Sequence, residues 1–337
     1  MARTLDDCLA SDVDPDVARA VAGVAEGVAD LSKRLGRGPF GFAPPTEDTP
    51  DAGDHAAFDV VADNLFASAL TASGVRFYAS EKRQSVATLD PAGSLSVALD
   101  PLDGSSNIGV DGPVGTIFSI RPARGAGPES FLAPNSEQLA AGYALYGPQT
   151  QFILTVGSGV CAFVLDPEDG RFKLISRDLR LPSDSNEYAI NASNRRRWPA
   201  AVLEFIEDCE AGVEGSQGSD FTMRWMASLV AETHRILTRG GLFLYPGDSR
   251  LGYARGRLRM LYECAPIAML IEQAGGASTD GERSILERSP STLHERTPFV
   301  FGSADRVHAV TTFLSRRDSA GSPLFGRRGL RDEKSSR

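Results

Sequence analysis

Apolar residues recur every three to four positions in six segments of the chain, which is the spacing of helices with one buried face. Two of these segments lie near the start, at residues 15–35 and at about 51–72. The other four lie in the second half, at 200–209, 223–239, 259–274 and 304–317. Glycine pairs at 240–241 and 275–276 follow two of them, as helix C-caps would. Pro266 lies inside the fifth pattern, so either its first turns are irregular or the helix proper starts at this proline.

Shorter apolar runs bounded by turn residues predict strands. Those of the first half lie at 94–100, 115–120, 141–147, 151–157, 160–166 and 171–176. The last four follow one another with no helix between them, which implies antiparallel pairing. Two more runs, at 242–246 and 298–303, alternate with the later helices.

The pattern loosens near residue 180, where we place a domain boundary. We expect an N-terminal domain over residues 1–180, which carries the antiparallel sheet and the candidate metal-binding acids, and a C-terminal domain over 181–316. The remaining segment, 317–337, is polar, rich in glycine and aperiodic, so it is predicted to be a disordered tail. Together these elements predict an α/β fold with α+β layers.

Composition narrows the classes of partner. The 337 residues carry a net charge of −9, so no broad basic field is present for nucleic acid, and we expect no nucleic-acid partner. No apolar run approaches the roughly 18 residues of a membrane span, so no membrane partner is expected either. The opening MARTLDDCLA has acids where a secretory signal would be apolar, and the four cysteines form no CxxC pair. We therefore expect a cytoplasmic protein.

Two aspartates end an apolar run in the stretch VALDPLDGSSNIGV. Ligand sites in α/β proteins lie at the carboxyl ends of strands, and Asp100 and Asp103 on a tight turn can converge on one point. Two such carboxylates repel each other unless a cation lies between them. Mg²⁺ uses a few carboxylates plus phosphate oxygens, and Gly104, Ser105 and Ser106 offer N–H groups and hydroxyls to a phosphate. The alternative is a surface turn, since Asp, Pro, Gly, Ser and Asn all favour turns.

Two further acids favour the metal site over the surface turn. Glu81 follows an apolar stretch and Glu263 lies inside one, and an acid in such a segment is seldom buried unless it is paired or metal-bound. Asp59 and Asp63 are one turn apart on a predicted helix, and we interpret Asp63 as a surface acid or as an ordinary helix acid.

Four motifs, in the right order between about residues 15 and 315, resemble class I fructose-1,6-bisphosphatase, in particular its bacterial, Calvin-cycle-like branch. They are ALDPLDGSSNIGVDGPVGTIFSI, GYALYGPQTQFILTV, LVAETHRILTRGGLFLYP and GRLRMLYECAPIAMLIEQAGG. The resemblance implies a sugar-phosphatase fold of alternating helix and sheet layers, and a homotetramer. It also implies an enzyme that uses Mg²⁺ or Mn²⁺ to convert fructose 1,6-bisphosphate to fructose 6-phosphate and phosphate, in gluconeogenesis or the Calvin cycle.

The resemblance also assigns roles to single residues. The implied metal ligands are the side chains of Glu81, Asp100, Asp103 and Glu263 and the carbonyl of Leu102. The implied catalytic residues are Asp59, which would help to deprotonate the attacking water, together with Glu81 and Arg259 near the transferred phosphoryl group. The implied substrate contacts are Asp103, Gly104, Ser105 and Ser106 at the 1-phosphate, and Asn191, Arg224, Tyr245 and Arg257 at the 6-phosphate end. In the family, the counterpart of Arg224 reaches in from a neighbouring subunit.

The chain departs from the family motif next to Glu81. The usual Ser-Glu-Glu reads Ser80-Glu81-Lys82, and the second glutamate normally assists the nucleophilic water or a further metal. Three outcomes are open: one metal is lost or weakened, Lys82 pairs with phosphate or with Asp59, or the loop shifts.

Three alternatives to the main function remain. A sedoheptulose-1,7-bisphosphatase, alone or as a second activity, would share the metal site. An inositol-monophosphatase-like enzyme shares the Asp-Pro-x-Asp-Gly turn but would carry a late Trp-Asp motif, where this chain has LYEC. The third alternative is a catalytically weak relative that senses sugar phosphates, and Lys82 in the place of the usual glutamate is the feature that supports it.

Overall fold

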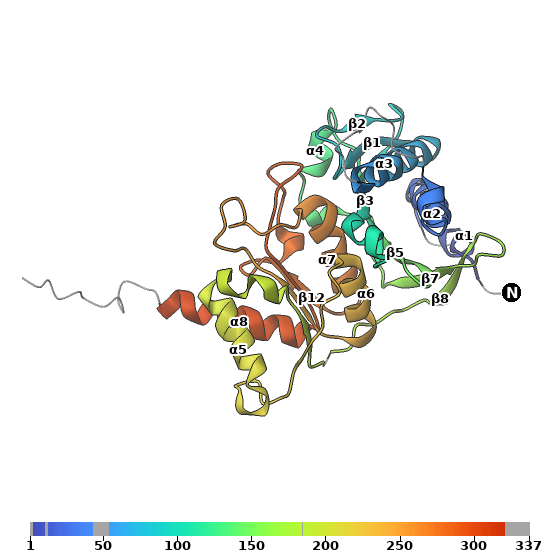
Figure 1. Cartoon of the computed structure of the whole chain (residues 1–337). Helices are drawn as coiled ribbons and strands as arrows, with labels where there is room; N and C mark the ends of the chain where they lie inside the picture. Colours follow the sequence, from blue (N-terminus) through green and yellow to red (C-terminus); the bar gives the residue numbers. More distant parts are fainter. Residues whose placement is uncertain (1–2, 11–12, 43–53, 184, 321–337) are drawn as a thin grey trace, which may run out of the picture.

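The computed structural model of the chain describes residues 3–10, 13–42, 54–183 and 185–320. Its strands form two sheets, one of eight strands and one of five, and helices cover the faces of both (Figure 1). The predicted α/β class with α+β layers is therefore confirmed. Among the described residues, no helix combines the length and the apolar character that crossing a membrane requires.

The first sheet has the strand order β2-β1-β3-β4-β5-β6-β7-β8. Its strands are β1 Val75–Ser80, β2 Ala87–Thr88, β3 Leu95–Asp103, β4 Val114–Pro122, β5 Ala140–Tyr146, β6 Thr150–Thr155, β7 Cys161–Leu165 and β8 Phe172–Ser176. Strands β1 and β3 run parallel, and every other neighbouring pair is antiparallel. The antiparallel pairing predicted for the last four runs is confirmed.

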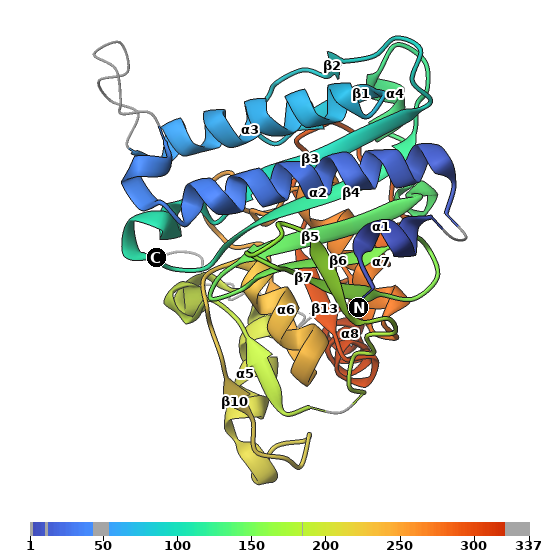
Figure 2. The same ribbon diagram turned by 90° about the vertical axis from the view of Figure 1, so that its right-hand side faces the viewer.

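Residues of β4 alternate between the two faces of this sheet. On one face, Phe118 and Ile120 pack with the long helices α2 (Pro15–Leu35) and α3 (Asp54–Ala72), which lie side by side in Figure 2. Helix α2 begins where predicted, because Pro15 is its first residue and the Asp14 side chain caps the N–H groups of the first turn. On the other face, Ile117 packs with helices α6 (Leu229–Arg239) and α7 (Ala265–Gln273).

The second sheet has the order β10-β9-β11-β13-β12. Its strands are β9 Glu187–Ala189, β10 Thr222–Met223, β11 Leu242–Tyr245, β12 Ala277–Thr279 and β13 Phe299–Gly302. Phe243 and Phe301 face α6 and α7, whereas Leu242 and Leu244 face α5 (Ala200–Glu210) and α8 (Ala304–Ala320). The molecule is therefore five layers deep: helices, sheet, helices, sheet, helices (Figure 1).

Shorter helical segments complete the chain. They are α1 Leu5–Leu9, η1 Gly38–Gly41, η2 Ser105–Val110, α4 Pro128–Phe131, η3 Asn135–Glu137, η4 Ala192–Arg197, η5 Gly212–Glu214, the π-helical turn η6 Met260–Cys264 and η7 Ile285–Glu287. Of the two arrangements left open around Pro266, the irregular first turn is the observed one, because η6 is a π turn that leads directly into α7.

Two predicted boundaries need correction. The helix predicted from residue 223 begins only at Leu229, because the Ser228 hydroxyl caps it by accepting a bond from the N–H of Ala231. The tail predicted to be disordered from residue 317 is helical as far as Ala320, where α8 ends. The rest of that tail, and residues 51–53 of the second predicted helix, lie outside the described residues.

Candidate active site

Three acids from two segments meet at one edge of the first sheet. Asp100 lies inside β3 and Asp103 ends it, while Glu263 comes from the π turn η6. One carboxylate oxygen of each lies within 4.8 Å of the others. Residues three apart on a regular strand point to opposite faces. The register of β3 against β4 shifts between Asp100 and Asp103, and this irregularity lets both carboxylates turn to the same point.

The π turn explains how Glu263 reaches the strand. The N–H of Cys264 donates to the carbonyl of Arg259, which is the i to i+5 bond of a π-helix. The N–H of Arg259 in turn donates to a carboxylate oxygen of Glu263 at 2.5 Å. The wide turn therefore directs Glu263 toward Asp100 and places the Arg259 side chain beside the same cluster.

The three acids lie in a poorly solvated place. Asp100 is 4% exposed and Glu263 is 8% exposed. Burial raises the pKa of Asp100, Asp103 and Glu263 above the usual carboxylate range, and the charges of the two aspartates raise the pKa of Glu263 further. Buried carboxylates at this spacing are costly without a cation, and oxygen donors are what Mg²⁺ and Mn²⁺ prefer. The residues present therefore fit a divalent metal ion.

Asp103 also connects the cluster to helix α6. Its Oδ2 atom accepts a hydrogen bond of 3.1 Å from the N–H of Val230, in the first turn of that helix. This bond opposes the effect of burial on the pKa of Asp103. Leu102 is buried between the two aspartates, and its N–H donates to Oδ1 of Asp100 at 3.2 Å.

Lys82 lies among three carboxylates beside this cluster. Its ammonium nitrogen is 2.8 Å from Glu81 Oε2, 3.4 Å from Asp59 Oδ1 and 3.8 Å from Asp100 Oδ1. The other oxygen of Glu81 is 2.8 Å from the guanidinium of Arg259. Both oxygens of Glu81 are thus paired with cations. The sequence left open whether Lys82 pairs with Asp59, and the structure shows this pairing.

Asp59 and the small residues after β3 border the same space. Asp59 comes from helix α3, and burial raises its pKa even though the positive charge of Lys82 lowers it. The hydroxyl of Ser105 points to Asp59 Oδ2 at 3.5 Å. Gly104 has φ 74°, a conformation that glycine adopts readily, and it turns the chain from β3 into η2. Ser106, the next residue of η2, is exposed.

A second group of predicted residues lies at the edge of the second sheet. Asn191 and Tyr245 line one small pocket, which is completed by Ile190, Asn194, Trp198, Leu244, Pro246 and Asp248. The side-chain oxygen of Asn191 accepts from the N–H of Ser193. Arg250 contacts two residues of this pocket: it donates to the side-chain oxygen of Asn194 at 3.1 Å and pairs with Asp248. The ring of Trp225 lies 6.3 Å from that of Tyr245.

The two arginines predicted for this end have other contacts. Arg224 has half of its side chain exposed, and its Nε atom is 3.6 Å from Glu187 Oε1. The guanidinium of Arg257 stacks over the ring of Tyr253, 5.0 Å from the ring centre. Among the described residues, therefore, the acids and Arg259 come together, and Asn191 and Tyr245 share a pocket, whereas Arg224 contacts Glu187 and Arg257 contacts Tyr253.

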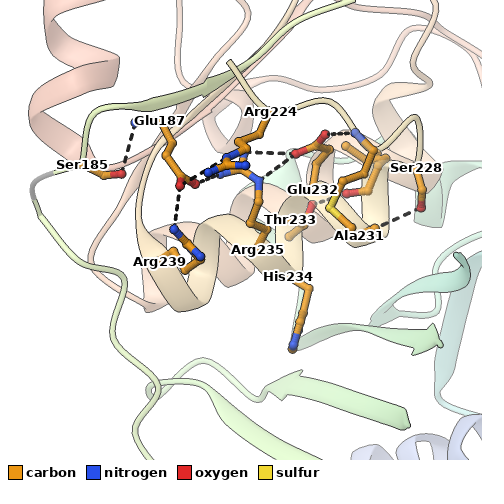
Figure 3. A network of polar contacts seen from close by, with 12 residues as sticks. Ser185, Glu187, Arg224, Ser228, Ala231, Glu232, Thr233, His234, Arg235 and Arg239 are labelled. Carbon is orange, nitrogen blue, oxygen red and sulfur yellow. Dashed lines mark hydrogen bonds and ion pairs between the residues drawn. The ribbon is translucent and has the colours of Figure 1, made fainter. Parts of the chain in front are cut away.

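Sequence reasoning missed an ionic network around Arg224 (Figure 3). Glu187 of β9 pairs with Arg235 at 2.6 Å, with Arg239 at 2.8 Å and with Arg224. Arg235 also pairs with the buried Glu232, which accepts from the N–H of Met226. The signal available in the sequence was the i, i+3 spacing of Glu232 and Arg235 on α6.

A histidine near the cluster was also missed. His294 lies between the side chain of Arg259 and the loop after β1. Arg259 Nε donates to His294 Nδ1 at 3.3 Å, and His294 Nε2 is 2.8 Å from the carbonyl oxygen of Arg83. A carbonyl can only accept, so the proton is on Nε2 and Nδ1 is free to accept from the arginine. The surrounding loop has no periodic pattern, so the sequence offered no signal.

Of the two interpretations of Asp63, the surface acid was wrong, because this residue of helix α3 is buried. Asp63 is 6% exposed, and it accepts from the hydroxyl of the buried Tyr78 at 2.9 Å and from Arg83 at 2.6 Å. Because Arg83 follows Lys82, these bonds hold the segment that carries Glu81 and Lys82.

The fold has close counterparts among solved structures. The crystal structure of Leishmania major fructose-1,6-bisphosphatase in holo form has a TM-score of 0.83 and 30% sequence identity to this chain, and the match covers 94% of this chain and 99% of that one. The apo form of the same protein has a TM-score of 0.82 at 29% identity. The layered architecture described above is thus that of a sugar-bisphosphatase fold.

Sequence comparison narrows this class to one family. The family model described as "Fructose-1-6-bisphosphatase, N-terminal domain" matches residues 46–177, and "Fructose-1-6-bisphosphatase, C-terminal domain" matches 181–315. The chain is 50% identical over 318 residues to fructose-1,6-bisphosphatase class 1 of Paracoccus denitrificans, covering 94% of this chain and 96% of that one. It is 51% identical over 326 residues to a class 1 enzyme of Bradyrhizobium sp., covering 96% and 95%. The chain belongs to the class 1 fructose-1,6-bisphosphatase family.

Proposed function

We propose that this protein hydrolyses the 1-phosphate of fructose 1,6-bisphosphate, giving fructose 6-phosphate and phosphate, with Mg²⁺ or Mn²⁺ as cofactor. The observation that carries the proposal is that carboxylate oxygens of Asp100, Asp103 and Glu263 lie within 4.8 Å of one another. The chain is also 50% identical to the class 1 fructose-1,6-bisphosphatase of Paracoccus denitrificans. When bound there, a divalent ion would polarise the phosphoryl group and stabilise the charge that develops during displacement.

The residues around the cluster have separate roles in this proposal. Asp59 takes a proton from the attacking water, and its raised pKa keeps it a better base than an exposed aspartate. Arg259 leaves its contact with Glu81 to bind the transferred phosphoryl group, because a guanidinium matches phosphate geometry. Ser105 and Ser106 donate hydroxyl hydrogen bonds to the same phosphate, and Gly104 allows the turn that brings them there.

We infer that His294 is a positioning residue for Arg259. Its Nδ1 atom accepts from Arg259 Nε, which leaves the two terminal nitrogens of the guanidinium to the phosphoryl group. The bond from His294 Nε2 to the Arg83 carbonyl holds the ring in this orientation.

The 6-phosphate is assigned to the second region. Asn191 and Tyr245 line the pocket proposed for it, and Arg257, whose guanidinium lies over the ring of Tyr253, adds positive charge. In this proposal the protein is a cytoplasmic homotetramer that works in gluconeogenesis or the Calvin cycle, and Arg224 completes the site of a neighbouring subunit. The exposure of half of the Arg224 side chain supports that arrangement.

Phosphate release by the purified protein tests the function. Fructose 1,6-bisphosphate and sedoheptulose 1,7-bisphosphate are compared side by side, with Mg²⁺, with Mn²⁺ and with chelator. The proposal predicts metal-dependent release with the higher kcat/KM for the six-carbon substrate. A higher value for the seven-carbon substrate would make the protein a sedoheptulose-1,7-bisphosphatase, and binding of either sugar without release would favour the sensor.

A further inference from the structure

The clustered acids of the candidate active site border two places, each of which can hold a cation. The first is bordered by Asp100, Asp103 and Glu263, whose ligand oxygens lie within 4.8 Å of one another. The second is bordered by Glu81, Asp59 and Asp100, and the ammonium group of Lys82 lies in it. Asp100 belongs to both places. Three carboxylates meet at the first place, whereas the second already contains a tethered cation.

The lysine is held in the second place by charge and by packing. Its ammonium nitrogen lies 2.8 Å from Glu81, 3.4 Å from Asp59 and 3.8 Å from Asp100, so carboxylates from three sides hold it there. The side chain is only 22% exposed. The Glu81 oxygen that Lys82 leaves free is paired with Arg259, so Glu81 has no uncompensated oxygen left for a metal.

We propose that Lys82 takes the place of one divalent ion, so that the resting site binds a single metal ion, held by Asp100, Asp103 and Glu263. This inference deepens the proposed function and rests on it for the statement that the metal serves catalysis. The physical reason is repulsion: a second divalent ion near Glu81 and Asp59 would lie within a few ångströms of the ammonium group, in a place where water screens little. It would also have to displace both cations from Glu81.

The charge of the group is consistent with one ion. Five carboxylates surround the two places, those of Asp59, Glu81, Asp100, Asp103 and Glu263. Lys82 and Arg259 offset two of these five charges, which leaves three when all acids are ionised. One divalent ion reduces the remainder to one negative charge, and two would reverse the sign before any phosphate arrived.

Counting bound Mn²⁺ tests the inference without reference to turnover. Free Mn²⁺ is measured by electron paramagnetic resonance during titration of the full-length protein at neutral pH, with no sugar phosphate present. We expect one tightly bound ion per chain in the wild type. For Lys82→Glu and Lys82→Gln we expect a second ion per chain, bound more tightly in the glutamate variant. Lys82→Arg keeps the charge and is expected to bind one ion, and Lys33→Gln, which removes an exposed lysine of α2, controls for net charge.

Two results would overturn the inference. One is a wild-type count other than one ion per chain, and the other is a count in Lys82→Glu equal to that of the wild type. Thermal unfolding with and without Mn²⁺ verifies that each variant is folded and supplies a second measure of binding. Phosphate release from fructose 1,6-bisphosphate is measured separately, so a protein with the expected counts but no hydrolysis would contradict the proposed function and leave the inference intact.

Discussion

The two ends of the candidate active site differ in how completely one chain builds them. At the metal end, Asp100, Asp103 and Glu263 are brought within 4.8 Å by a strand irregularity and a π turn, both buried in the core. At the sugar-phosphate end, Asn191 and Tyr245 line a small pocket, while Arg224 contacts Glu187 and Arg257 stacks on Tyr253. The comparison shows that the three acids already lie together in one chain, whereas Arg224 and Arg257 are held by other residues of the chain.

Removal of one carboxylate at the metal end is expected to have the largest effect. Asp100→Asn keeps the shape but takes away a ligand, so kcat for fructose 1,6-bisphosphate should fall by about a thousandfold or more, while KM changes only a few-fold. Because one charge leaves a repulsive buried cluster, the metal-free variant should unfold at a higher temperature than the wild type. A variant that retains near-normal kcat would place the metal elsewhere.

At the sugar-phosphate end, we expect a smaller effect, which acts on substrate binding and so on KM. Arg224→Ala should raise KM by about 10- to 100-fold, the loss typical of a charge-assisted contact, with a smaller change in kcat. Arg239→Ala is the matched control, because Arg239 is also exposed and also pairs with Glu187. Equal effects of the two substitutions would show that Arg224 acts through Glu187 alone and not through the substrate.

An intermediate effect is expected for the contact between Arg259 and His294, because it orients an arginine that we propose to be catalytic. His294→Leu removes the acceptor for Arg259 Nε, and kcat should fall by about tenfold, near the free energy of one hydrogen bond to a charged group. His294→Gln can still accept from Arg259 and donate to the Arg83 carbonyl, so it should recover most of the activity. Equal losses in both variants would assign His294 a packing role only.

The smallest expected effect is on stability as a function of pH. Burial raises the pKa of Asp100 and Asp103 in the folded protein, so the folded state holds these protons more tightly than the unfolded chain. Metal-free stability should therefore decrease as pH rises above the ordinary aspartate value of about 4. Metal binding releases the protons, so the rise in unfolding temperature caused by Mn²⁺ should grow with pH, by about 2–4 °C for each tenfold gain in affinity.

Calorimetric scans between pH 5 and pH 8 would measure this change. Asp100→Asn should flatten the dependence, since it removes one of the three buried acids whose pKa is raised. A constant effect of Mn²⁺ over that range would mean that the cluster is already ionised before the metal binds.

The same contrast appears in what the sequence could predict. Helix α2 was predicted over its full length from its apolar periodicity, and the aspartate cap and first-turn proline seen in the structure agree with that prediction. The acids of the metal end were identified because each stands at the end of, or inside, an apolar segment. These signals depend only on residues that are close together in the sequence, so they can be recognised without knowledge of the fold.

What could not be predicted depends on contacts between distant segments. The start of α6 was misplaced because MRWM continues an apolar pattern, although Ser228 is the actual cap. The burial of Asp63 was not predicted, because its partner Tyr78 lies on strand β1, for which the sequence pattern predicted no strand. The position of Lys82 follows from three carboxylates on separate elements, and no spacing in the sequence encodes it.

Anomalous diffraction from crystals grown with Mn²⁺ would test the central claim most directly, since it locates the ion without reference to activity. The account predicts a peak within coordination distance of one oxygen each of Asp100, Asp103 and Glu263, with the Lys82 ammonium still beside Glu81. A peak between Glu81 and Asp59 with Lys82 displaced, or no peak at the three acids, would contradict it.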